Sequence, residues 1–430
     1  MPVRYLLFGW DYNWGLRNQG LMRYREINDV GDFSRDVAVV IDFIGQEEYR
    51  RSFAAIGKSL NLKGFVTPFD DALFALELDL FNLEMLRTKC SGNFQSLPEK
   101  CHEGVSFLIG LGQTIPVLSP GARVRLLGRL RSGLQEGLWP LQHELGVAGN
   151  LSKRGWDIYF HDLEEGGGYD FLVSQKGTKF EVESKAISAF TGWPIKPENL
   201  NKLLVEIKQH FDCEYDTGIP LIGLKLSGSL PAERTLLQQL VSALTMVAQT
   251  REGLSVLGSQ VRFIGTISDM TLQKLHVAAS VHARMAKKIV LVIPPPPKLV
   301  LELDSDKPIQ LERKIIRTVN GAAREQFSRL NPAVIWTHVK FITKEGFTQL
   351  STSKDGRACL FDSMASRVLL SEKRNHLTQL VFTGGSFLEK TGDTACSSYE
   401  AAVYDSPICR FGKKIVFPGG RTRAAAGGTG

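Results

Sequence analysis

Two short stretches decide the fold that the sequence predicts: Gly-Gly-Gly-Tyr-Asp at 166–170 and Phe-Glu-Val-Glu-Ser-Lys at 180–185. The second stretch alternates apolar and charged residues, as a β-strand does, so Glu183 and Lys185 share one face. Asp170 opens another short apolar run. If the two runs pair as neighbouring strands, Asp170 lies beside Glu183, and two carboxylates and an ammonium group meet at one point of the sheet.

The residues around these stretches predict an α/β unit over 119–230. Leucines recur at steps of three and four from Leu127 to Leu151, which is typical of amphipathic helix, and Pro140 fits the first turn of a second helix. Turn residues separate the apolar runs that follow. The expected order is two helices meeting near 137–140, strands at 156–160, 169–173 and 179–184, a helix at 197–211 and a strand at 219–226.

A chain of 430 residues exceeds what one hydrophobic core usually supports, so we expect several domains. Residues 1–118 are predicted to form an N-terminal α/β module, with a strand at 37–44 and helices at 46–60 and 72–86. A C-terminal α/β region is expected over 231–418 and a disordered tail over 419–430. In the C-terminal region we expect helices beginning near 231 and 313, and strands at 261–267, 288–293, 333–338 and 378–383.

Composition and charge narrow the class of protein. The chain is 43% hydrophobic and 23% charged, as an ordinary folded soluble protein is. Its net charge of +7 favours an anionic partner, of which nucleic acid is the commonest. Six dispersed cysteines without a Cys-x-x-Cys pair indicate neither a zinc module nor a disulfide framework. No apolar run is long enough to span a bilayer, so we expect a cytoplasmic protein without membrane contact.

Asp170, followed by Glu183-x-Lys185 on the next predicted strand, resembles the motif of the PD-(D/E)xK nuclease superfamily, which has the restriction-endonuclease-like fold. The resemblance covers 119–230, and the predicted order of helices and strands is similar to the family core. It implies a mixed sheet flanked by helices. It also implies that Asp170 and Glu183 bind Mg²⁺, or Mn²⁺ in its place, and that Lys185 positions or activates the attacking water.

Glu144 extends this resemblance, because many relatives carry a glutamate on the helix before the first strand. Glu144 lies three residues from Leu141 and four from Ala148, so it projects from the apolar stripe of its helix. A carboxylate there is costly unless a cation or a hydrogen-bond donor receives it. The predicted catalytic residues are therefore Lys185, Glu183, Asp170 and Glu144, with Asp170, Glu183 and Glu144 as metal ligands.

These observations predict a magnesium-dependent nuclease that hydrolyses phosphodiester bonds, with DNA as the substrate by analogy with the family. Two alternatives stay open: a catalytically inactive nucleic-acid-binding protein on the same fold, and a protein-interaction protein whose carboxylates and lysine form a salt-bridged strand face. Glu181 is expected at the edge of the pocket, and His161 at the surface. The arginines within 123–131 and 313–329 are interpreted as solvated sides of amphipathic helices.

Overall fold

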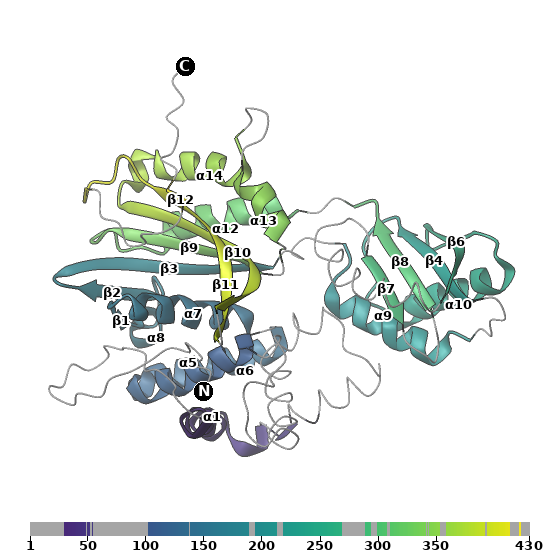
Figure 1. The fold of residues 1–430 in the computed structure, drawn as a ribbon, viewed down its shortest axis with the longest axis horizontal. Coiled ribbons are helices and arrows are strands. Elements are labelled where there is room, and N and C mark those ends of the chain that lie inside the picture. The colour runs from purple at the N-terminus through teal and green to yellow at the C-terminus, as the bar shows by residue number, and fades with distance from the viewer. Residues whose placement is uncertain are drawn as a thin grey trace. The chain divides into compact units, whose positions relative to one another are not determined.

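The computed structural model describes residues 30–48, 50–51, 54, 102–136, 138–188, 194–212, 218–268, 289–293, 299–307, 310–340, 342, 344–352, 358–391, 394–412 and 421–422. Contacts among them divide the chain into two compact units (Figure 1). Unit 1 lies within Met1–Ile56, Phe74–Ser188 and Ile315–Gly430, and the described part of unit 2 lies within Ala189–Lys314. Unit 1 is therefore discontinuous in sequence.

Unit 1 is built on a mixed sheet of seven strands in the order β1-β2-β3-β9-β10-β11-β12. Strands β1 to β3 form an antiparallel meander, whereas β3, β9 and β10 run parallel to one another. The strands are β1 (Asp157–Tyr159), β2 (Phe171–Gln175), β3 (Thr178–Ser188), β9 (Ala333–Lys340), β10 (Leu377–Thr391), β11 (Thr394–Asp405) and β12 (Arg421–Thr422).

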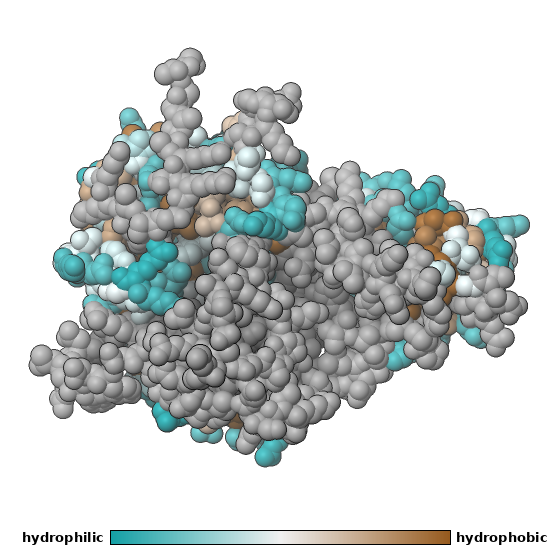
Figure 2. Space-filling view, viewed as in Figure 1, coloured by the Kyte–Doolittle hydropathy of each residue, from teal (hydrophilic) through white to brown (hydrophobic). Residues whose placement is uncertain are grey.

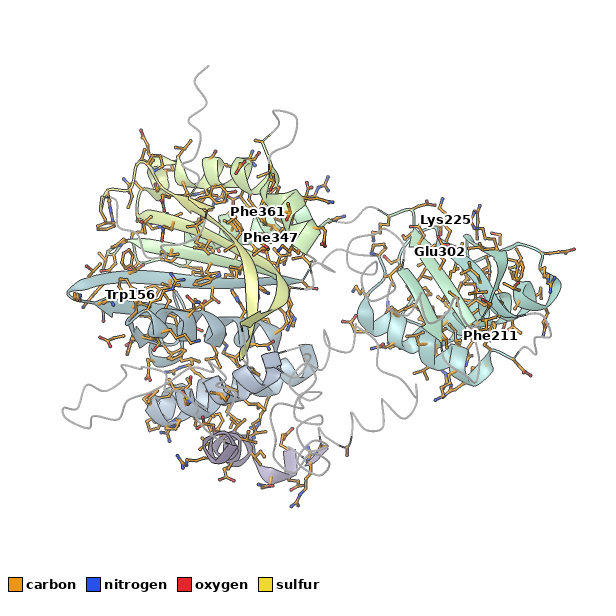
Figure 3. The ribbon with its side chains drawn as sticks, viewed as in Figure 1. Trp156, Phe211, Lys225, Glu302, Phe347 and Phe361 are labelled. Carbon is orange, nitrogen blue, oxygen red and sulfur yellow. The ribbon has the colours of Figure 1, made fainter. Side chains whose placement is uncertain are left out.

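Helices cover both faces of this sheet. Figure 1 shows α5 to α8 on one side and α12 to α14 on the other. Trp156, which packs edge-on against Phe180, and the Phe347–Phe361 pair belong to the two opposite layers (Figure 3). The helices are α1 (Val30–Ile44), α5 (His102–Val117), α6 (Pro120–Glu136), α7 (Trp139–Lys153), α8 (His161–Glu165), α12 (Leu311–Glu325), α13 (Lys344–Ser351), α14 (Leu360–Leu369) and the 3₁₀ turn η3 (Glu372–Arg374).

Unit 2 is a smaller α/β unit with a five-stranded sheet in the order β5-β6-β4-β8-β7. Leu224, on β4, belongs to its apolar core, whereas its neighbour Lys225 is exposed. Figure 3 shows Lys225 and Glu302 away from Phe211, and Figure 2 shows hydrophobic surface on this unit. Its elements are α9 (Pro197–His210), β4 (Ile219–Leu226), α10 (Arg234–Thr250), β5 (Leu254–Val256), β6 (Ser259–Ile267), β7 (Ile289–Ile293) and β8 (Leu299–Ser305).

Several local predictions are confirmed. Two helices meet near residue 138, and Pro140 lies in the first turn of α7, where its missing N–H costs no helical hydrogen bond. The three strands of the meander form where the turn residues predict them. The strand predicted at 37–44 is wrong, because these residues belong to helix α1. Val40 and Ile44 are one turn apart and both are buried, so packing overrides the β-branched composition.

The chain divides differently from the expected boundaries at 118 and 230. The predicted helix at 197–211 and strand at 219–226 both form, but β4 pairs with β6 and β8 inside unit 2. The strand that pairs with β3 is β9, and α12 precedes it. The predicted helix at 72–86 lies outside the described residues, as do most of the helix predicted at 46–60 and the tail except Arg421–Thr422.

Glu181 anchors the loop between α12 and β9. Its fully buried carboxylate accepts hydrogen bonds from the backbone N–H of Ser328 (2.9 Å), from the Ser328 hydroxyl and from the Asn331 amide (3.1 Å). In addition, the backbone N–H of Glu181 donates to the carbonyl of Pro332 at 2.9 Å. Glu181 therefore holds the loop before β9 and not the edge of a pocket.

Replacing Glu181 with Ala should destabilise unit 1, because three donors lose a charged acceptor that they share. The expected loss is about 2–4 kcal/mol in the free energy of unfolding, measured by chemical denaturation. Lys179→Ala removes an exposed side chain of the same strand and should leave the unfolding midpoint unchanged. An equal midpoint for the two variants would contradict the anchoring role.

Candidate carboxylate and lysine site

Strands β2 and β3 bring the predicted acidic pair together. Phe171 and Val182 are register partners, so Asp170, directly before β2, lies opposite Glu183 on β3. Asp170 is fixed by its Oδ2 atom, which accepts a hydrogen bond from the backbone N–H of Ser184 at 2.6 Å. Both carboxyl groups are shielded from water, with 9% of Asp170 and 1% of Glu183 exposed.

Lys185 joins this pair from the same strand as Glu183. Its ammonium group forms an ion pair with Oε1 of Glu183, and its side chain is 30% exposed, so it lies between the buried carboxylates and solvent. The second oxygen of Glu183, Oε2, is buried and has no hydrogen-bond partner among the described residues. A buried carboxylate oxygen without a donor is costly, and a proton, a hydrogen-bond donor or a cation at this oxygen would remove that cost.

The glycine run holds the chain that leads into Asp170. Helix α8 ends at Gly166, and Gly166, Gly167 and Gly168 have φ angles of 81°, 158° and 93°, which glycine adopts without strain. His161 stacks on Tyr169 with ring centroids 4.1 Å apart, and its Nδ1 atom lies 3.1 Å from the carbonyl of Gly167. His161 is therefore part of this turn, and it fixes the position from which β2 begins.

The carboxylate of Glu144 forms an ion pair with a guanidinium group. Arg129, on α6, faces both carboxylate oxygens of Glu144, and its Nη1 atom also lies 3.2 Å from Asp162. The cation that the apolar position of Glu144 requires is thus supplied by this arginine. In this arrangement both oxygens of Glu144 are occupied, so the structure does not present Glu144 as an open metal ligand.

Sequence reasoning interpreted Arg129 as one of several solvated arginines. Because Glu144 projects from an apolar stripe, the sequence indicates that it needs a cationic partner. Several arginines lie at a similar distance along the chain, so the sequence does not show which of them is that partner. The structure separates them: Arg125 donates to the carbonyls of Leu163 and Glu164, and Arg123 donates to the carbonyl of Pro116. Only the packing of α6 beside α7 and α8 shows which arginine meets the carboxylate.

The electrostatics of the site follow from this burial. Burial raises the pKa of Glu183 to about 7, although the ion pair with Lys185 acts in the opposite direction. Burial and the charges of Glu144 and Glu183 raise the pKa of Asp170 well above its ordinary value. For Lys185, burial alone lowers the pKa, but the carboxylates of Glu183 and Asp170 outweigh it and raise the pKa, so the amine stays protonated.

The site therefore has more acidic than basic groups. Three buried carboxyl groups face two cationic side chains, those of Arg129 and Lys185. No group of three or more His, Cys, Asp or Glu side chains within the described ranges is arranged to hold a metal ion. Two carboxylates are nevertheless the number that Mg²⁺ needs when water and phosphate oxygens complete its coordination. Asp170 and the open Oε2 of Glu183 fit that requirement, whereas Glu144 does not.

Comparisons with known proteins yield no relative: no family model, curated protein or solved structure matches the chain. Among the described helices, none has both the length and the apolar character that a transmembrane segment requires.

Substituting Glu183 with Gln should reveal the raised pKa as a difference in stability. A carboxyl group whose pKa is raised on folding stabilises the fold while it is protonated, and this contribution is lost as pH rises from 4.5 to about 7. In a buffer with a metal chelator, Glu183→Gln and wild type should unfold alike below pH 4.5. Above pH 7 the variant should be more stable, by up to about 3 kcal/mol.

The comparison of the two proteins is essential, because the buried histidines His143 and His376 have lowered pKa values and change the stability of both proteins in the same way. Their contribution cancels in the difference between the proteins. A difference that stays constant from pH 4 to 8 would contradict the raised pKa of Glu183.

A double-mutant cycle tests the pairing of Arg129 with Glu144. Arg129→Met alone leaves a buried carboxylate without its cation and should cost about 3 kcal/mol in denaturant unfolding. Adding Glu144→Gln should recover most of this loss, because the charge that needed a partner is gone. If the loss of unfolding free energy in the double variant equals the sum of the losses in Arg129→Met and Glu144→Gln, the ion pair contributes nothing to folding.

Proposed function

We propose that unit 1 is a magnesium-dependent nuclease with a restriction-endonuclease-like core that hydrolyses phosphodiester bonds in DNA. The observation that carries the proposal is the convergence of Asp170, Glu183 and Lys185 on two paired strands, with Oε2 of Glu183 buried and unpartnered among the described residues. A buried surplus of carboxylate beside a protonated amine is suited to binding a divalent cation together with a phosphate.

The topology of unit 1 supports this proposal. Helix α7 precedes the meander β1–β2–β3, and α12 leads into β9, which lies parallel to β3. This is the order of helix, three strands, helix and strand that the resemblance implies. The difference is that unit 2 is inserted between β3 and α12. The insertion lengthens the connection and leaves the pairing of the core strands intact.

Each side chain has a defined task in this proposal. When bound, Mg²⁺ would lower the pKa of a coordinated water and offset charge on the phosphate. Asp170 and Glu183 would hold the ion. Lys185 is protonated, so it would orient the attacking water and donate to a phosphate oxygen, and it would not serve as the base. Arg129 would neutralise Glu144 and so keep the pocket from accumulating further negative charge.

The ion pair between Lys185 and Glu183 favours a second candidate, an inactive nucleic-acid-binding protein on the same fold. In that case the ammonium group of Lys185 takes the place of the metal ion beside Glu183, and no metal ion binds there. The two candidates differ in one measurable property, because only the nuclease binds Mg²⁺ or Mn²⁺ at Glu183.

The nuclease is tested by incubating the protein with Mg²⁺ and with DNA or RNA. Asp170→Asn, Glu183→Gln and Lys185→Met should each lower the cleavage rate of DNA at least about a hundredfold, because each removes a metal ligand or the group that orients water. The matched controls are Lys179→Met, on the same strand, and Glu345→Gln, on α13, both of which alter exposed side chains. The controls should cleave at the wild-type rate.

Calorimetry with Mn²⁺ completes the test. Wild type should bind the ion and Glu183→Gln should lose most of that binding. Cleavage that persists in all three site variants would refute the assignment of the site. DNA binding by a wild-type protein that neither cleaves nor binds Mn²⁺ would select the inactive candidate.

A further inference from the structure

Four arginines gather at the end of the sheet where β9 and β10 begin. Arg324 lies on α12, Arg329 in the loop before β9, Arg374 on η3, and Arg410 beyond β11. We name this group the arginine cluster. Three of its side chains are exposed and that of Arg374 is half-buried, so the cluster is open to solvent.

Hydrogen bonds hold Arg329, Arg374 and Arg410 around His376. Arg324 lies near Arg374, because its charge, after burial, lowers the pKa of the Arg374 guanidinium. The backbone N–H of Arg410 donates to the carbonyl of Asn375 at 2.9 Å, and its guanidinium donates to the carbonyl of Arg329. The guanidinium of Arg374 donates to Asn320 on α12 at 3.0 Å. These hydrogen bonds connect segments of unit 1 that are far apart in the sequence. The tertiary structure therefore fixes the position of the cluster.

His376 forms the floor of the cluster. It is 1% exposed, its ring packs edge-on against Phe327 at 5.8 Å, and its Nε2 atom is buried without a hydrogen-bond partner in the described chain. Burial, followed by the charges of Arg329, Arg410 and Arg374, lowers its pKa to about 4. The imidazole is therefore neutral, and it adds an unused polar nitrogen to the site without adding positive charge.

Ion pairs do not offset the charge of the arginine cluster in the part of the chain that the structure describes. Within the described residues, none of the four arginines forms an ion pair with a carboxylate. Like charges held together repel, and the arrangement is favourable when an anion occupies it. The guanidinium group presents paired N–H donors in the geometry of a phosphate, so phosphate is the anion that the cluster fits.

We propose that the arginine cluster binds a backbone phosphate of the nucleic acid on which the carboxylate site acts. This inference rests on the proposed function for the identity of the phosphate. The sheet supplies the link between the two sites: Glu183 is paired with Ile335 on β9, and the neighbouring strand β10 begins directly after His376. Strand spacing and rise separate Glu183 from His376 by roughly 14 Å, about four nucleotides of one duplex strand.

The test is DNA binding by Arg324→Gln/Arg329→Gln. These two side chains are exposed, and within the described residues neither forms a side-chain hydrogen bond or an ion pair that supports the fold, so the variant should unfold at the wild-type midpoint. The matched control is Arg317→Gln/Arg367→Gln, which removes the same charge from exposed positions on α12 and α14 outside the cluster. Fluorescence anisotropy with a short labelled duplex, in the presence of a metal chelator, measures affinity without cleavage.

The cluster variant should bind DNA about tenfold more weakly, and the slope of log affinity against log salt should fall by about one for each phosphate that the variant no longer neutralises. The control should keep the wild-type slope. Identical affinities and slopes for the cluster variant and the control would overturn the proposal. The proposal would also be overturned if the cluster variant lost binding of inorganic phosphate but kept the wild-type affinity for DNA. The cluster would then bind free phosphate and not the DNA backbone.

This outcome is separable from that of the proposed function. A cluster variant that loses DNA binding, in a protein that never cleaves, would refute the nuclease and support the phosphate site. Conversely, cleavage that depends on Asp170 but not on the arginines would support the nuclease and overturn the phosphate site.

Discussion

Unit 1 depends on the parallel pairing of β3 with β9. Parallel strands cannot be joined by a tight turn, so a long crossover must connect them, and here that crossover contains the whole described part of unit 2 before it ends in α12. The strand that carries Glu183 and Lys185 thereby becomes an internal strand with neighbours on both sides. Because helices cover both faces of the sheet (Figure 1), the acidic side chains of this internal strand are buried, and burial raises the pKa of Glu183.

Glu181 and Glu183 show how the same strand assigns two carboxylates to different tasks. Glu181 meets the donors of Ser328 and Asn331, so its charge is satisfied by the loop that re-enters the sheet. Glu183 meets a single ammonium group and retains an oxygen without a donor among the described residues. The hydrogen bonds of Glu181 stabilise the fold. The unpaired oxygen of Glu183 instead destabilises it, and a ligand that contacts this oxygen would remove the loss of stability. Stability given up at such a position is typical of functional sites.

The two clusters of ionisable groups in unit 1 differ in character. The carboxylate site holds buried acidic groups whose pKa values are raised, and the arginine cluster concentrates positive charge where β9 and β10 begin. Under the proposed function, a cation bound in the pocket and the positive charge of the arginine cluster would together favour the approach of a phosphate backbone.

The sequence by itself determined the local elements of the site. The glycine run, the alternation of Phe180 to Lys185 and the leucine spacing before them follow short-range rules of backbone and burial, so the meander and the two helices could be predicted directly. Only the tertiary structure decided which distant segments complete them. Strand β4 and strand β9 have similar apolar composition, and composition does not encode which one pairs with β3. The partner of Glu144 and the gathering of arginines around His376 were likewise set by packing, because these residues are far apart in sequence and meet only when the sheet is formed.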